Sequence, residues 1–117
     1  MTPLEHKRQI LRRVRRVVVK IGSQILSSSK GIEESRLRAL VRELAALHDQ
    51  EKEIVVVSSG AVAAGMTRLR RKERPKTIPE KQALAAVGQI RLMALYERHF
   101  SKFDKSVAQV LLTHEDL

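Results

Sequence analysis

Two short stretches decide the fold that the sequence predicts: RVVVKIG at residues 16–22 and EIVVVSSG at residues 53–60. Each is a run of β-branched residues that lacks the polar and apolar alternation of a half-exposed strand. Both are therefore predicted to be strands buried on their two faces. The segment between them predicts a helix through about residue 50, because its apolar residues recur at helical spacing: Leu37, Leu40, Val41, Leu44 and Leu47.

Strand, helix and strand in this order predict a right-handed crossover that joins two parallel strands. A turn is expected at 27–31, where three serines precede Lys30 and Gly31. Residues 61–69 predict a short helix of small residues, and 107–112 a third strand. The predicted fold class is α/β, with a partly parallel sheet that is covered by helices.

Two further helices are marked by their first residues. Thr2-Pro3-Leu4-Glu5 and Thr77-Ile78-Pro79-Glu80 both place Thr at the cap, Pro in the first turn and Glu at the third helical position. A short basic helix should follow the first motif, and a long helix that reaches about His99 should follow the second. The polar, basic segment at 70–79 is predicted to be a loop.

The composition limits the classes of protein that fit. The chain has 117 residues, of which 43% are hydrophobic, so one domain is expected. It has no cysteine, which excludes disulfides, thiolate metal sites and cysteine nucleophiles, and a cytoplasmic protein is expected. No apolar run approaches the ~20 residues of a membrane span, and the charged start does not fit a secretory signal.

The net charge of +10 comes from two clusters. Residues 6–16 hold six Lys or Arg and no acid, and residues 68–76 hold six against Glu73 alone. Such clusters are more often solvated surface, and a polyanion-binding module, for which nucleic acid is the usual partner, is the alternative. Nucleic acid is nevertheless an unlikely partner on composition, because aromatic residues that stack on bases are only 3% of the chain.

Ligands of open α/β sheets bind beyond the carboxyl ends of the strands, so the residues after the two predicted strands are the candidates. Lys20 interrupts an apolar strand near its end and precedes Gly22 and Ser23. A glycine lets backbone N–H groups approach a phosphate, and the lysine adds a compact positive charge. A lysine that extends from a strand end into solvent explains the same pattern.

The second strand leads through Ser58, Ser59 and Gly60 into a helix that begins at Ala61. Free N–H groups at a helix start attract an anion such as a carboxylate. Serine capping and a tight turn explain the same residues. Two adjacent parallel strands would place this turn beside the Lys20 turn, so that one rim could hold a phosphate and a carboxylate.

Other residues give weaker signals. The four histidines lack metal-ligand spacing and are expected to be surface or capping residues: His6, His48, His99 and His114. Gly88, inside the long predicted helix, is expected to allow close packing of a neighbouring element. Neither a Walker-type loop nor a dinucleotide glycine motif is present.

Four motifs in register resemble the glutamate 5-kinases of the amino-acid kinase family. They are VVKIGS at 18–23, VVSSGAVAAG at 56–65, KQALAAVGQ at 81–89 and QVLLT at 109–113. The resemblance runs from about Arg16 to the last residue. Position 23 is Ser and position 24 Gln, where many members of that family have Thr and then Ser.

The resemblance implies roles for these residues. Lys20 would contact the ATP phosphates and stabilise the transferring phosphoryl group, and Gly22 and Ser23 would line the phosphate turn. Ser59, with Gly60 and Ala61 and the neighbouring Ser58, would bind glutamate. The implied reaction makes glutamyl 5-phosphate on the route to proline, with Mg²⁺ carried by the nucleotide and a homo-oligomeric enzyme.

The kinase domain of that family has three α/β/α layers and continues beyond residue 117. We therefore expect residues 1–15 to be a basic helical extension and residues 16–117 to be the amino-terminal portion of the domain, inactive alone. Aspartate, acetylglutamate or carbamate as the acceptor remain alternatives to glutamate.

Overall fold

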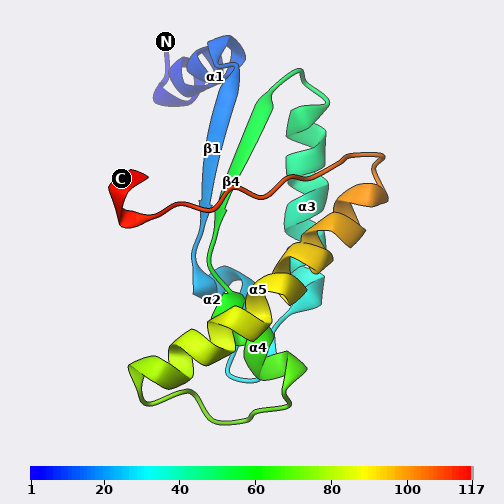
Figure 1. Cartoon of the computed structure of the whole chain (residues 1–117). Helices are drawn as coiled ribbons and strands as arrows, with labels where there is room; N and C mark the ends of the chain where they lie inside the picture. The colour runs from blue at the N-terminus through cyan, green and yellow to red at the C-terminus, as the bar shows by residue number, and fades with distance from the viewer. Residues whose placement is uncertain (117) are drawn as a thin grey trace.

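Two parallel strands form the centre of the computed structural model, which describes residues 1–116 apart from the side chain of His114. β1 (Arg16–Ile21) pairs with β4 (Glu53–Ser58) in a register that sets Lys20 opposite Val57. Between them the chain forms α3 (Glu34–His48), which lies beside the strands (Figure 1). The predicted strand–helix–strand unit is thus confirmed, as is the α/β class.

Only one face of the strand pair is covered. Val19, Ile21, Ile54 and Val56 point into the core, whereas alternate residues face outward, and Val18 is 62% exposed. The prediction that both strands are buried on two faces is wrong for the described chain. The helices that cover the strands pack on one face alone, so β-branched residues on the other face stay in contact with water.

A short helix and a small hairpin follow β1. The helix is α2 (Ser23–Leu26), and β2 (Ser27–Ser28) then pairs antiparallel with β3 (Gly31–Ile32). The predicted turn is confirmed, although four residues were too few for periodicity to reveal α2. Gly31 has φ of 117°, and a Cβ there would lie 2.1 Å from Thr67 Oγ1, so this turn requires glycine.

Two helices pack closely near the carboxyl ends of the strands: α4 (Ala61–Arg68) and α5 (Ile78–Ser101) (Figure 1). A Cβ on Gly88 of α5 would lie 1.7 Å from the Ala61 carbonyl oxygen, and one on Gly65 of α4 would lie 2.0 Å from the Leu84 carbonyl oxygen. Each glycine therefore lets the other helix's backbone approach, which confirms the packing role predicted for Gly88. Thr77 caps α5 as predicted, since its Oγ1 accepts a hydrogen bond from the Glu80 N–H.

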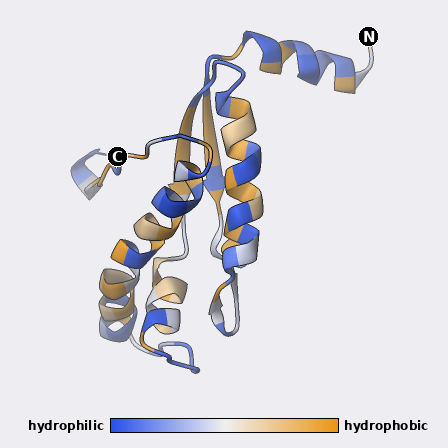
Figure 2. Cartoon of the chain, turned by 90° about the vertical axis from the view of Figure 1, so that its right-hand side faces the viewer, coloured by the Kyte–Doolittle hydropathy of each residue, from blue (hydrophilic) through white to orange (hydrophobic). Residues whose placement is uncertain are grey.

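The basic amino-terminal segment forms α1 (Pro3–Arg13), which projects from the rest of the chain (Figures 1 and 2). Thr2 and Glu5 form the predicted capping box, and none of the helix residues is buried. The Lys52 ammonium donates to the Leu11 carbonyl at 2.7 Å and also to that of Val14. This contact ties the end of α1 to the start of β4.

The third strand predicted at 107–112 is wrong for the described chain. These residues have no ladder partner and run as an exposed segment to the short 3-10 helix η1 (His114–Asp116). Leu111 is 75% exposed, so its apolar side chain is not part of the core. A strand needs an edge to pair with, and this segment lies along none.

Candidate functional site

The candidate site begins where β1 and β4 end together. The Ser59 N–H donates to the Ile21 carbonyl at 2.9 Å, which extends the ladder one residue past β4. Since the strands are parallel, this bond holds the turn that starts at Gly22 beside the turn that starts at Ser59. The predicted meeting of the two turns at one rim is therefore confirmed.

Gly60 turns the chain from β4 into α4. Its φ of 114° lies in the left-handed region, where a side chain would be strained, so the turn requires glycine. No side chain caps α4, and its first N–H groups at Ala61 and Val62 are available to a ligand. The Ser59 side chain is exposed and makes no hydrogen bond within the described part of the chain.

Ser58 is already engaged by the fold. Its Oγ lies 2.8 Å from the Tyr96 hydroxyl and donates to the Ser59 carbonyl at 2.8 Å. Burial raises the pKa of Tyr96, although its bond to Ser58 opposes this shift. The hydrogen bond between the Ser58 and Tyr96 hydroxyls anchors the turn to α5.

A cavity of about 490 Å³ opens at this turn. Most of the predicted site residues line it: Ser23, Ser58, Ser59, Gly60 and Ala61. Residues without a predicted role line it as well, and three of them come from the basic loop and the start of α5: Arg74, Pro75 and Lys81. The charge count identified the basic, proline-containing segment that holds Arg74 and Pro75, but it did not predict that this segment lies against the site.

Lys20 and Gly22 lie outside this cavity. Lys20 is exposed on the uncovered face of the strands, next to Val18 and opposite Val57. A Cβ added to Gly22 would meet nothing within 4 Å, and its φ of −74° suits any residue, so the fold itself has no need of glycine there. Open space beside a bare backbone is what the approach of a phosphate requires.

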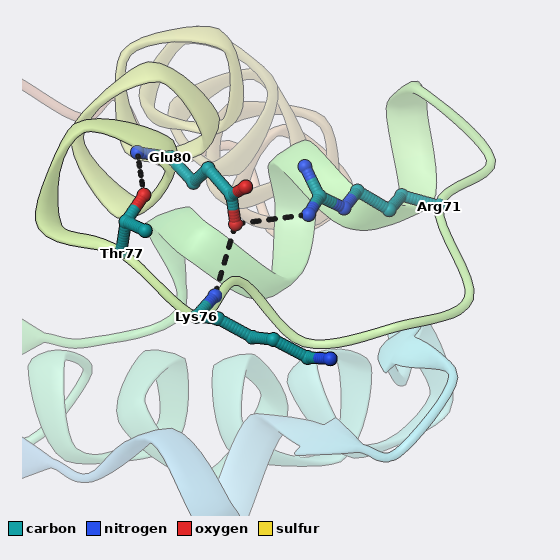
Figure 3. Close-up of polar contacts among 4 residues, drawn as sticks. All are labelled: Arg71, Lys76, Thr77 and Glu80. Carbon is teal, nitrogen blue, oxygen red and sulfur yellow. Dashed lines mark hydrogen bonds and ion pairs between the residues drawn. The ribbon is translucent and has the colours of Figure 1, made fainter.

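The basic loop at 69–77 is held against α5 by one carboxylate (Figure 3). Glu80 Oε2 accepts hydrogen bonds from the Lys76 backbone N–H at 2.9 Å and from Arg71 Nη2 at 3.1 Å. The backbone bond from Lys76 and the positive charge of Arg71 lower the pKa of Glu80, so the carboxylate stays ionised. We refer to these three residues as the Glu80 clasp.

A larger hollow of about 640 Å³ lies on the covered side of β4. Its walls are mostly apolar, with Ile54, Val56, Met93 and Phe100 among them, and Ser58 is the one predicted site residue that it touches. We therefore assign the candidate site to the smaller cavity, which combines the two turns with cationic side chains.

Two of the four histidines lie on the surface and a third is buried. His6 and His48 are exposed as expected, but His99 is buried, with its Nε2 2.9 Å from Glu34 Oε1. The expectation of a surface position is wrong for His99, because α5 turns this residue toward α3. The side chain of His114 lies outside the described part. Within that part no cluster of three potential metal ligands is found, and no helix is long and apolar enough to cross a bilayer.

The chain has relatives among known proteins. Residues 15–117 match the amino acid kinase family. The chain is 52% identical over 112 residues to a glutamate 5-kinase of Teredinibacter turnerae. The matched region covers 95% of this chain and 30% of that protein. It is 53% identical over 103 residues to a glutamate 5-kinase of Thermus thermophilus, covering 88% of this chain and 28% of that protein. A glutamate 5-kinase of Geobacter sp. strain M21 is 51% identical over 112 residues, 95% of this chain and 30% of that protein. The chain thus spans about three tenths of the length of these curated relatives.

Proposed function

This chain belongs to the amino acid kinase family, and on that premise we propose that it carries the phosphate lysine and the acceptor turn of a glutamate 5-kinase. The observation that carries the proposal is the Ser59 to Ile21 hydrogen bond, which holds the two turns side by side. The relatives at about 50% identity are named glutamate 5-kinases, which supports glutamate as the acceptor. We infer that the reaction transfers a phosphoryl group from ATP to the side-chain carboxylate of glutamate.

The chemistry makes little demand for a general base. The γ-carboxylate of glutamate has a pKa near 4.3 and is already ionised at neutral pH, so it attacks the phosphorus without losing a proton. Catalysis then depends on placing the two reactants and on neutralising charge in the transition state. We assign charge neutralisation to Lys20 and acceptor placement to Ser59, Gly60 and Ala61, with Ser58 as their anchor.

The residues present fit the phosphates of ATP at the β1 end. Gly22 offers an unobstructed backbone, Ser23 adds a hydroxyl, and Lys20 is exposed one residue before the strand ends. ATP supplies the phosphoryl group, and these residues would bind and orient its phosphate chain. We propose that Mg²⁺ enters on the nucleotide, where it would neutralise phosphate oxygens.

The wider setting follows from the same proposal. The product would be glutamyl 5-phosphate, an acyl phosphate, for proline synthesis in the cytoplasm, and we expect the enzyme to be a homo-oligomer. We propose that residues 1–15 form an extension and that 16–117 contribute the amino-terminal portion of the kinase domain. We also expect the purified chain to have no measurable kinase activity by itself.

The test is a chimaeric enzyme in which this chain replaces the matched segment of the Thermus thermophilus glutamate 5-kinase. Trapping the acyl phosphate with hydroxylamine measures turnover. We expect kcat/KM for glutamate to exceed that for aspartate and acetylglutamate by about a hundredfold, because binding groups left unpaired by the wrong acceptor are costly. The unmodified Thermus enzyme is the control. Equal or better turnover of aspartate or acetylglutamate would refute the proposed acceptor.

A further inference from the structure

The cavity of the candidate site has one strongly basic wall. Arg74 comes from the loop at 69–77 and Lys81 from the first turn of α5, and both line the cavity together with Ser59 and Gly60. No Asp or Glu of the described chain lines this cavity, and no ion pair there involves either cation. Two cationic residues without an ion-pair partner in the described chain therefore line the cavity.

The Glu80 clasp fixes both parts of this wall. Glu80 is the neighbour of Lys81, and it binds Arg71 and the Lys76 backbone on either side of Arg74 (Figure 3). Arg71 also donates its backbone N–H to the Met66 carbonyl at 2.8 Å, so the start of the loop is tied to α4. A loop fastened at these points presents Arg74 in a restricted set of positions, which lowers the entropy lost on binding.

The wall is separate from Lys20, although Ser23 of the phosphate turn lines the same cavity. Neither Lys20 nor Gly22 lines the cavity, so the charge of Arg74 and Lys81 is additional to that at the end of β1. The reacting carboxylate of the acceptor has to lie by the phosphate turn. A second anionic group on the same acceptor would then meet the basic wall, and a guanidinium with an ammonium suits a carboxylate.

We propose that Arg74 and Lys81 bind the carboxylate of the acceptor that does not react, and that Arg71 and Glu80 are positioning residues for this wall. The inference rests on the proposed function for the identity of the acceptor. The inference assigns the selection of acceptors to the basic wall, because an acceptor without the second carboxylate leaves Arg74 and Lys81 unpaired.

The first experiment titrates the ¹⁵N-labelled chain with glutarate, a dicarboxylate that has no ammonium group. We expect the amide signals of Ser59, Gly60 and Ala61 to shift, and the Kd to rise about tenfold in either Arg74→Met or Lys81→Met, as for loss of a hydrogen bond to a charged group. Arg74→Lys should retain most of the binding.

Lys72→Met is the matched control, because it removes an exposed positive charge of the same loop at a residue that neither lines the cavity nor belongs to the Glu80 clasp. Its Kd should equal that of the unmodified chain. Absence of glutarate shifts in the unmodified chain, or equal Kd values for Arg74→Met, Lys81→Met and Lys72→Met, would overturn the inference.

The second experiment measures kinetics in the chimaeric enzyme. Arg74→Met and Lys81→Met should raise KM for glutamate about tenfold and leave kcat and KM for ATP unchanged. Glu80→Gln should raise the same KM, but should add nothing in a background that carries both Arg74→Met and Lys81→Met, which a merely destabilising change would not do. A fall in kcat at unchanged KM would place the wall at the reacting carboxylate and refute the assignment.

The two experiments separate the two proposals. If glutarate binding depends on Arg74 and Lys81 but the chimaeric enzyme turns over another acceptor, then the proposed acceptor is wrong and the basic wall stands. If glutamate is phosphorylated and neither substitution changes KM, then the proposed function stands and the basic wall is refuted.

Discussion

The two halves of α5 stabilise the chain in different ways. The amino-terminal half meets α4 through Gly88, whose missing side chain leaves room for the Ala61 carbonyl, and its first turn holds the loop through Glu80. The carboxyl-terminal half buries large side chains against α3 and the strands, including Leu92 and Tyr96. Close contact between helix backbones positions the site at the amino-terminal end of α5, and burial of apolar surface stabilises the core at its carboxyl-terminal end.

The difference predicts that the site end of α5 tolerates less change than the core. An apolar core accepts substitutions of similar volume, because neighbouring side chains can adjust their rotamers. A carbonyl in contact with a glycine has no rotamer to change, so an added side chain must move a whole helix. Since Gly88 contacts the first residue of α4, such a shift would reach the acceptor turn.

Gly88→Val should cause the largest loss of stability. The new side chain would overlap the Ala61 carbonyl and push α4 from α5, and we expect the free energy of unfolding to fall by about 3 kcal/mol. Urea denaturation of the chain, followed by circular dichroism, measures this change.

Gly22→Ala is the matched control, because the added methyl group meets nothing within 4 Å and the backbone there is unstrained. It should change the free energy of unfolding by less than about 0.5 kcal/mol. Similar losses in Gly88→Val and Gly22→Ala would show that close packing at Gly88 is not what stabilises this end of α5.

In the carboxyl-terminal half of α5, His99 should make the free energy of unfolding depend on pH. This effect should be smaller than that of Gly88→Val. Burial lowers the pKa of His99, and the nearby charges of Lys102, Arg98 and Arg38 lower it further. The bond to Glu34 engages Nε2, while the buried Nδ1 has no hydrogen-bond partner in the described chain. Protonation is thus easier in the unfolded chain, whose histidine has a pKa near 6.5.

As the pH falls below about 6.5, the unfolded state gains a proton before the folded state does, so the chain should lose stability. One group contributes a slope of at most about 1.4 kcal/mol per pH unit. Urea denaturation between pH 7.5 and 5 measures the slope, which should flatten in His99→Gln and persist in His6→Gln on the exposed α1. An unchanged slope in His99→Gln would contradict the proposed cause.

Much of the fold followed from local patterns in the sequence. Three local patterns predict these elements: the β-branched runs, the helical spacing of leucines, and the two helix starts that combine Thr and Pro. The helix starts satisfy backbone hydrogen bonds within the segment, and the apolar patterns give an element a face that can be buried. The prediction that both faces of the strands are buried was wrong. A run such as Val17-Val18-Val19 indicates that a strand can be buried, but it does not indicate which helices cover it. The strand predicted at 107–112 was wrong because pairing requires a partner edge, which no local pattern contains.

The candidate site divides in the same way. The positions of Lys20, Gly22, Ser59 and Gly60 at the two strand ends could be predicted, because strand ends and glycine turns have fixed places in an α/β sheet, whereas their roles stay predictions. The contribution of residues such as Arg74 could not, because it depends on how a loop folds back over α4. Ser58 marks the intermediate case, where the residue was predicted but its bond to Tyr96 was not.

The most direct test of the account compares Lys20→Met with Ser59→Ala in the chimaeric enzyme. If the β1 end neutralises the phosphoryl group and the β4 end places the acceptor, Lys20→Met should lower kcat about a hundredfold or more at saturating glutamate. Ser59→Ala should raise KM for glutamate about tenfold with KM for ATP unchanged. Undiminished kcat in Lys20→Met, or equal changes of both KM values in Ser59→Ala, would contradict the division of labour between the two strand ends.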